Sequence, residues 1–186
     1  MASSKERPAP GDLALIQEFV NSTNVGTGRE DLVSPEQMVA WFSRHGLPTG
    51  SGLPSMADVR RTIELREAIR RVLLANGGGS VDPEAVETLN RTVRTAQLGF
   101  TFSCDREARL EPSAQGIDGA LGRLVAIIAD AMAHGTWARL KACPDDHCLW
   151  AFYDYSKNRS GRWCTMRVCG NRLKARTFRS RHKTST

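Results

Sequence analysis

The residues best suited to chemistry are four cysteines in the last quarter of the chain, arranged as two identically spaced pairs. The first pair is Cys143-Pro-Asp-Asp-His-Cys148, and the second is Cys164-Thr-Met-Arg-Val-Cys169. Zn²⁺ takes four thiolate or imidazole ligands at about 2.1–2.3 Å, and two short loops can present four thiolates to one ion. The spacing therefore predicts one tetrahedral metal site, which would stabilise a segment too small to fold by burial alone.

Two disulfides are the alternative interpretation, and the cellular compartment decides between the two. The first ten residues contain no apolar stretch before a cleavage site, so we expect no export signal. No apolar run approaches the ~18 residues that a membrane span requires. We therefore expect a cytoplasmic protein without membrane association, in which reduced, paired cysteines hold metal more often than disulfides. The odd fifth cysteine, Cys104, favours the same interpretation.

The identity of the metal follows less directly from the spacing. In many zinc ribbons about two residues separate the paired cysteines, whereas the pairs here are spaced more widely. Iron–sulfur clusters also use four cysteines. We expect one Zn²⁺. His147 could replace the adjacent Cys148 as a ligand, and His182 lies beyond Cys169, but both are better interpreted as a loop histidine and a tail histidine.

Charge is divided unevenly along the chain. From Arg139 onward, 12 Lys and Arg stand against 3 acids, a net charge of +9. The preceding 14 basic and 17 acidic residues give −3. A near-neutral body followed by a strongly basic segment is typical of a nucleic-acid-binding module attached to another domain.

The segment after Cys169 contains no proline, and we expect a helix that extends to Lys183. In such a helix Arg172, Arg176, Arg179 and Lys183 share one face, because they recur at helical spacing. Arginine can hold a phosphate or the edge of a guanine with two parallel hydrogen bonds. This basic stripe is therefore the predicted DNA-contacting surface.

The elements that must position these residues are mainly helical. Apolar periodicity and capping residues predict helices at about 13–20, 35–42, 55–76, 83–93 and 117–134. Val86, Leu89 and Val93 mark the apolar face of the fourth helix, and Met132 belongs to the apolar face of the fifth. Residues 98–103 and 108–111 predict a small β-hairpin. The expected fold class is mainly α with a small β-hairpin: a helical N-terminal domain, the body (1–136), and a small C-terminal zinc-finger module, the finger module (137–186).

Other motifs in the body favour ordinary structural roles. Five arginines gather on the 55–76 helix among glutamates, a composition typical of a solvated, ion-paired face, with nucleic-acid contact as the less favoured alternative. They are Arg60, Arg61, Arg66, Arg70 and Arg71. Gly26-Thr-Gly28 follows no predicted strand and indicates a loop. No Ser/His/Asp set, paired-carboxylate motif or phosphate loop stands out in the sequence, so we expect no enzymatic activity.

Aromatic residues are concentrated in the finger module, where 6 of the 12 follow Arg139. We expect Trp150, Phe152 and Trp163 to pack around the metal, because so short a segment has few aliphatic side chains to bury. The alternative is that exposed Tyr153 or Tyr155 stacks on unpaired bases, as in single-strand binders.

Taken together, these motifs resemble one known family. The CGNR zinc finger resembles residues 137–181, through both cysteine pairs, Trp150-Ala-Phe-Tyr-Asp154 and Cys169-Gly170-Asn171-Arg172. More loosely, Phe19-Val20-Asn21-Ser22 and Leu65-Arg66-Glu-Ala-Ile69 resemble the helical ABATE domain that precedes this finger. The resemblance implies a bacterial stress-induced transcription regulator. It also implies one zinc ion on the four paired cysteines, with Asn171 and Arg172 in structural or DNA-facing positions. Gly161 departs from the family pattern, where a basic residue is common.

The expected function is therefore a zinc-dependent transcription regulator. Its body would sense a small-molecule effector or a protein partner, and its finger module would bind duplex DNA. Pairing of two bodies in a homodimer would suit two half-sites. The predicted DNA contacts are Asn171, Arg172, Lys174, Arg176, Arg179, Arg181 and Lys183, and the candidate ligand contacts are Asn21, Arg66 and His134. Two alternatives stay open: an RNA or single-strand binder, and a small-molecule-binding domain that uses the finger only as a structural or protein-contact module.

Overall fold

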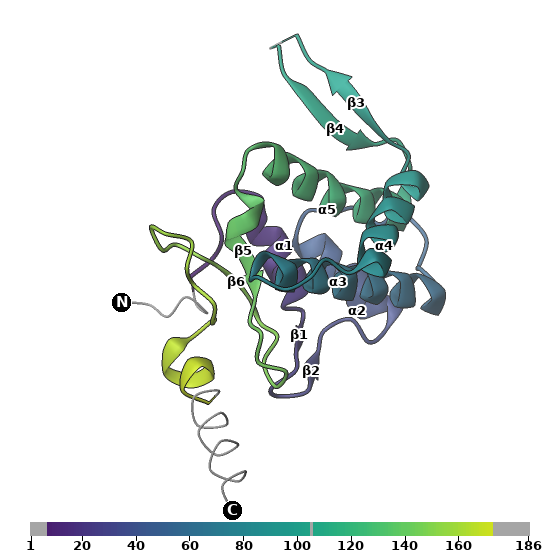
Figure 1. Cartoon of the computed structure of the whole chain (residues 1–186). Helices are drawn as coiled ribbons and strands as arrows, with labels where there is room; N and C mark the ends of the chain where they lie inside the picture. Colours follow the sequence, from purple (N-terminus) through teal and green to yellow (C-terminus); the bar gives the residue numbers. More distant parts are fainter. Residues whose placement is uncertain (1–6, 105, 173–186) are drawn as a thin grey trace, which may run out of the picture.

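The computed structural model of the chain describes residues 7–104 and 106–172 (Figure 1). Helices dominate this part of the chain, and the strands form short antiparallel pairs, β1 with β2, β3 with β4 and β5 with β6. The elements are α1 (Leu13–Val20), β1 (Thr23–Asn24), β2 (Arg29–Glu30), α2 (Pro35–Arg44), α3 (Met56–Asn76), α4 (Pro83–Thr95), β3 (Leu98–Phe102), β4 (Ala108–Pro112), α5 (Gly116–Ala133), η1 (Trp137–Arg139), β5 (Leu140–Ala142), β6 (Ala151–Tyr153) and η2 (Met166–Gly170). The predicted mainly α fold class is confirmed. Across the described residues, we find no helix with the length and apolar character of a membrane span.

Three helices begin at the polar residues that the sequence places before them. The Ser34 hydroxyl accepts a hydrogen bond from the Gln37 amide, and Ser55 forms a reciprocal capping box with Asp58. The Asp82 carboxylate accepts from the first amides of α4. These contacts satisfy amide groups that have no partner inside the helix. Local sequence therefore fixes where α2, α3 and α4 begin.

The body packs its helices around α3, which contacts α1, α2, α4 and α5 (Figure 1). Phe19, Phe42, Leu65, Ile69 and Leu124 are fully buried in this core. The apolar face predicted for α4 is wrong at Val86, which is exposed, because the helix turns Ala85 and Thr88 inward instead. Met132 of α5 is likewise exposed, because the neighbouring Ala131 faces the core.

Arg66 and Arg70 overturn the prediction of a solvated face on α3, because each is only 2% exposed. The Arg66 guanidinium donates two hydrogen bonds, of 2.6 and 2.7 Å, to the Glu30 carboxylate and a third to the Ser22 hydroxyl. The β1–β2 hairpin supplies Glu30 and thereby covers this face. Burial raises the pKa of Glu30, but the hydrogen bonds from Arg66 and from the Leu32 amide, together with the charge of Arg66, outweigh burial and hold the pKa below its usual value. The pairing compensates the guanidinium for the water that it has lost.

Candidate metal centre

A two-stranded ribbon connects the finger module to the body. Leu140 lies opposite Tyr153 and Ala142 lies opposite Ala151, and all four belong to the hydrophobic core of the helices. Phe152, which alternates with them along β6, packs instead with the cysteines. Because successive strand residues point to opposite faces, the ribbon β5–β6 belongs to both cores. It lies against α3 through β5 and against α1 through β6 (Figure 1).

The first cysteine pair lies on a tight knuckle that continues this ribbon. Cys143 follows β5 directly, and its amide donates to the Trp150 carbonyl at 2.9 Å. The amides of Cys148 and Leu149 both donate to the Asp145 carbonyl, at 2.7 and 3.0 Å. These bonds reverse the chain direction and bring Cys148 back to Cys143.

The second pair spans a wide helical turn. Cys164 precedes η2, and Cys169 lies within it. The amides of Cys169 and Gly170 both donate to the Thr165 carbonyl, which closes the turn between the two cysteines. A Cβ at Gly170 would lie 2.5 Å from the Met166 sulfur, so no side chain larger than hydrogen fits here without rearrangement.

The four thiols fit a single tetrahedral ion. All four Sγ atoms lie within 4.8 Å of one another. The Sγ of Cys164 is 3.5 Å from that of Cys148 and 3.7 Å from that of Cys169. A zinc ion bound at about 2.3 Å to each sulfur requires separations of about 3.8 Å, whereas a disulfide requires about 2.0 Å. Cys143, Cys164 and Cys169 are buried, and Cys148 is partly buried.

Thiols this close cannot all ionise without a cation. Burial, and then the charge of Cys143, raises the pKa of Cys169 to about 12. Hydrogen bonding with Cys143 raises the pKa of Cys164 and lowers that of Cys148 to about 2. A divalent cation supplies the missing positive charge, so metal binding releases protons and weakens as the pH falls.

Asn171 and Arg172, the last residues of the Cys-Gly-Asn-Arg motif, make contacts inside the module. The Arg172 Nη1 donates to Asp145 Oδ2 at 3.0 Å, and Asp145 is only 1% exposed. Asp145 Oδ1 accepts from the His147 amide. The Asn171 side chain donates to the Arg167 carbonyl at 3.0 Å. Arg172 therefore ties the start of the C-terminal segment to the first knuckle.

A buried ion pair organises the loop between the two knuckles. Lys141 Nζ lies 2.7 Å from Asp154 Oδ2 and also donates to the carbonyls of Arg159 and Gly161. The Gly161 amide donates to Asp154, and a Cβ at Gly161 would lie 2.7 Å from Asp154 Oδ1. The departure from the family pattern at Gly161 thus has a packing reason. Burial raises the pKa of Asp154, but hydrogen bonds from Lys141 and Ser156 outweigh it and lower the pKa to about 2.

The variant Asp154→Asn is expected to destabilise the protein by about 2 kcal/mol at neutral pH, because it leaves the Lys141 ammonium buried without its counter-charge. Chemical denaturation of the zinc-loaded protein measures this difference. Asp130→Asn is the control, because Asp130 is a mostly exposed aspartate with 73% side-chain exposure. Equal unfolding free energies for Asp154→Asn and Asp130→Asn would contradict the structural role of the pair.

The ligand candidates of the body do not form one site. Asn21 is buried and lines a cleft of about 310 Å³ with residues that include Trp41, Arg44 and the finger module's Trp150. The guanidinium of Arg66 donates hydrogen bonds to Glu30, Glu67 and Ser22. His134 ends α5 and pairs with Asp130 on the surface.

The positions of the aromatic side chains give little support to the single-strand alternative, which requires exposed tyrosine rings. Phe152, Trp150 and Trp163 pack around the cysteines as predicted. Tyr153 is buried, so base stacking by this residue is excluded. Tyr155 is 39% exposed, but its hydroxyl donates to the Pro8 carbonyl and Arg7 covers its ring at 3.6 Å.

Exposed basic side chains of the finger module were not singled out from the sequence. They are Lys157, Arg159, Arg162 and Arg167. The only sequence signal for them is the +9 charge of the segment, which does not say which side chains reach solvent. The predicted contacts Lys174, Arg176, Arg179, Arg181 and Lys183, and His182, lie outside the described residues.

Comparison with known families assigns both parts of the chain. Residues 13–136 match the model of ABATE, described as "Putative stress-induced transcription regulator", and residues 139–182 match the CGNR zinc finger. No curated protein matches the chain significantly. The finger family and the clustered thiols together support one bound zinc ion. The chain therefore belongs to the ABATE family and carries a CGNR zinc finger after its helical domain.

Proposed function

We propose that this protein is a zinc-dependent transcription regulator whose finger module binds duplex DNA. The observation that carries the proposal is the set of exposed cations in the finger module. Lys157, Arg162 and Arg167 are exposed, and within residues 7–104 and 106–172 none of the three forms an ion pair. Unpaired cations beside a rigid core are suited to phosphate oxygens, which supply most of the affinity for DNA.

The metal would act on DNA binding through the arrangement of the basic side chains. Zinc on Cys143, Cys148, Cys164 and Cys169 would join the two knuckles, and Arg172 fixes the start of the C-terminal segment on Asp145. The basic residues from Lys174 to Lys183 continue from this fixed start. Loss of zinc would thus separate η2, which carries Arg167, from the first knuckle.

The body would regulate this activity through the cleft beside Asn21. Its lining includes Arg44 with Trp41 of the body and Trp150 of the finger module. Arg29 and His45 also line the cleft but pair with Asp31 and Glu18 of the same lining. Arg44 would therefore bind the carboxylate or phosphate of an anionic effector, because a guanidinium group can donate two parallel hydrogen bonds to either. An effector bound there would contact both parts of the chain, which is how it could alter DNA affinity.

Binding to duplex DNA is expected to weaken steeply with salt. Each phosphate contact contributes about −0.9 to the slope of log affinity against log salt. The double variant Arg162→Ala/Arg167→Ala should therefore weaken binding and reduce the slope by up to about 2. Fluorescence anisotropy with a labelled duplex over a salt series measures both quantities.

The matched control is Arg94→Ala, which removes an exposed arginine of α4 that pairs with Glu87. It should leave the slope unchanged. Absence of duplex binding at low salt, or affinity that does not depend on salt, would refute the DNA proposal. Tighter binding to a single strand than to the duplex would favour the single-strand alternative.

A further inference from the structure

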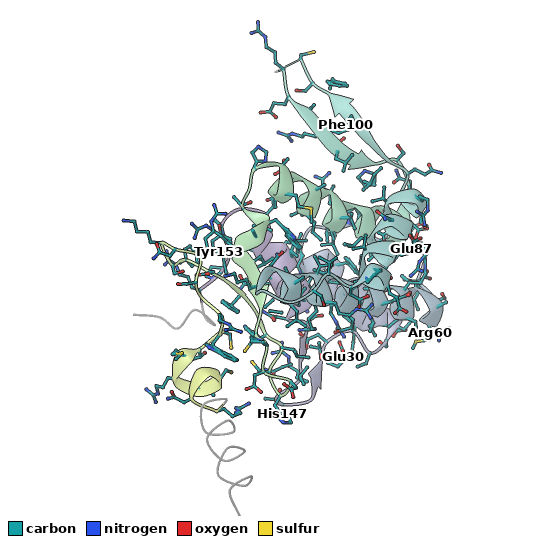
Figure 2. The ribbon with its side chains drawn as sticks, viewed as in Figure 1. Glu30, Arg60, Glu87, Phe100, His147 and Tyr153 are labelled. Carbon is teal, nitrogen blue, oxygen red and sulfur yellow. The ribbon has the colours of Figure 1, made fainter. Side chains whose placement is uncertain are left out.

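The segment between β6 and η2 contains a cationic loop, residues 156–161 (the basic loop). The nine residues between Asp154 and Cys164 include three cations and no acid. Within the loop, Lys157, Asn158 and Arg159 are all exposed. The chain runs outward from the end of β6, away from the helices, before it returns to η2 (Figures 1 and 2). The basic loop therefore presents side chains of the types that contact DNA on a part of the surface that projects from the body.

Buried charges fix the backbone of this exposed loop. Lys141 Nζ donates to the carbonyls of Arg159 and Gly161 at 2.6 and 3.0 Å. The Asp154 carboxylate accepts from the amides of Ser156 and Gly161 at 2.9 and 2.8 Å. Lys141 is only 5% exposed and Asp154 only 4%. Both ends of the basic loop, and the Arg159 carbonyl between them, are therefore held by charged groups of the finger module's interior.

Arg159 has a backbone conformation that arginine seldom adopts. Its φ is 52°, in the left-handed region, which glycine enters freely and most other residues enter only at a cost in free energy. The hydrogen bond from Lys141 holds the residue in this conformation. A glycine would form the same turn without strain, so the turn itself does not require arginine. Strained residues cluster at ligand-binding sites, which indicates a role for the exposed guanidinium.

The Arg159 guanidinium is available to a ligand. Within residues 7–104 and 106–172 it forms no ion pair, and the ion pairs nearest to it in sequence join Lys141 to Asp154 and Arg172 to Asp145. Arg94 of the body, which is also exposed, is by contrast paired with a glutamate. The basic loop thus combines a fixed backbone with an unpaired guanidinium.

We propose that the basic loop is the element of the finger module that reads DNA sequence, with the Arg159 guanidinium on the edge of a guanine base. This inference rests on the proposed binding of duplex DNA. A guanidinium holds guanine by two parallel hydrogen bonds to O6 and N7 in the major groove. That alignment favours an arginine whose backbone is fixed in advance, because less conformational freedom is lost on binding. Phosphate contacts require no such alignment, and the flexible ammonium of Lys157 suits them.

The test compares the sequences that the zinc-loaded full chain and its variant Arg159→Gln select from a random pool of duplexes. The wild type should enrich a motif with a guanine at a fixed position, and Arg159→Gln should lose that guanine. Fluorescence anisotropy with the selected duplex, and with the same duplex carrying adenine at this position, measures the discrimination. The wild type should prefer guanine by about 10- to 100-fold, and Arg159→Gln should bind the two duplexes about equally.

The matched control is Lys157→Gln, which removes one cation from the same loop. It should select the wild-type motif, weaken binding to both duplexes alike and reduce the salt slope by about 1. Arg159→Gly separates the side chain from the backbone: it relieves the left-handed strain, so its stability to denaturant should not fall, yet it should lose the guanine preference. Zinc content and circular dichroism should stay unchanged in all three variants.

The outcomes separate this inference from the DNA proposal. A motif that Arg159→Gln leaves unchanged, or duplex binding without any enriched motif, would overturn the inference and leave the basic loop with phosphate contacts only. Equal loss of the guanine preference in Lys157→Gln would also overturn it, because charge rather than the Arg159 contact would then set the preference. A wild type that binds no duplex at low salt would refute both proposals.

Discussion

Replacing Cys164 with serine is expected to abolish tight zinc binding and to unfold most of the finger module. Cys164 is fully buried, and its sulfur lies 3.5 Å from that of Cys148 and 3.7 Å from that of Cys169. A serine hydroxyl does not ionise near neutral pH and is a poor replacement for thiolate. Structural zinc supplies about 10–16 kcal/mol of folding free energy to small finger peptides. Within residues 7–104 and 106–172, the further apolar packing around the cysteines comes from Phe152, Trp150 and Trp163, a small cluster on which to hold the two knuckles together without metal.

The unfolding should stop at the β5–β6 ribbon. Leu140, Ala151 and Tyr153 belong to the core of the helices, so they should stay folded without metal. We therefore expect zinc per chain, measured by mass spectrometry of the metal, to fall from one to near zero. Tryptophan fluorescence should shift while far-ultraviolet circular dichroism changes little.

Cys104→Ser is the control for this experiment, because Cys104 is an exposed cysteine outside the cluster. It should retain zinc and fluorescence. Treating the wild type with a strong chelator should reproduce the spectrum of Cys164→Ser. A Cys164→Ser protein that keeps one tightly bound zinc and a folded finger module would contradict the four-thiolate assignment.

Features carried by neighbouring residues could be predicted from the sequence. The helix starts depend on Ser34, Ser55 and Asp82, which cap amides two or three residues away. The cysteine cluster was predictable because each pair lies on one short loop and only one partner loop exists. The β3–β4 hairpin could be predicted from residues 98–103 and 108–111 themselves, and the observed pairing of β3 with β4 agrees with that prediction.

Features that depend on distant partners could not be predicted. Arg66 and Arg70 alternate with glutamates as surface arginines do, and the sequence pattern is the same whether this face meets water or protein. Their burial depends on Glu30, which is 36 residues from Arg66, and on the Leu149 carbonyl, which is 79 residues from Arg70. The alternation in Leu140-Lys-Ala142 is too short to show that one face of β5 belongs to the helices.

Contacts between distant residues also make Asn21 a polar link between the body and the segment that leads to the metal centre. Its side-chain amide donates to the Ala151 carbonyl at 2.9 Å and accepts from the Ala151 amide at 2.8 Å. It therefore pairs with β6 as a neighbouring strand would. Nearby, Arg70 donates to the Val20 carbonyl at the end of α1 and to the Leu149 carbonyl of the first knuckle, at 2.6 and 2.7 Å. Helices α1 and α3 thus both hold the segment that carries Cys148.

Asn21→Ala is expected to lower the free energy of unfolding by about 2–4 kcal/mol, because it leaves a buried donor and a buried acceptor of Ala151 unsatisfied. Gln17 reaches the same carbonyl at only 3.4 Å and compensates little. Denaturant unfolding of the zinc-loaded protein measures the loss, with Asn90→Ala on the exposed face of α4 as the control.

The Asn21 contact also predicts that zinc binding and the stability of the body are coupled. If Asn21 holds the knuckle in the geometry that zinc requires, zinc must stabilise the body through the same contact, because such coupling is reciprocal. A chelator should then lower the melting temperature of the helices in the wild type and lower it less in Asn21→Ala. Zinc affinity should fall in Asn21→Ala although every cysteine is intact. Equal chelator effects in both proteins would show that the coupling does not pass through Asn21, and a chelator that leaves the melting temperature of the wild type unchanged would show that the body and the metal centre fold independently.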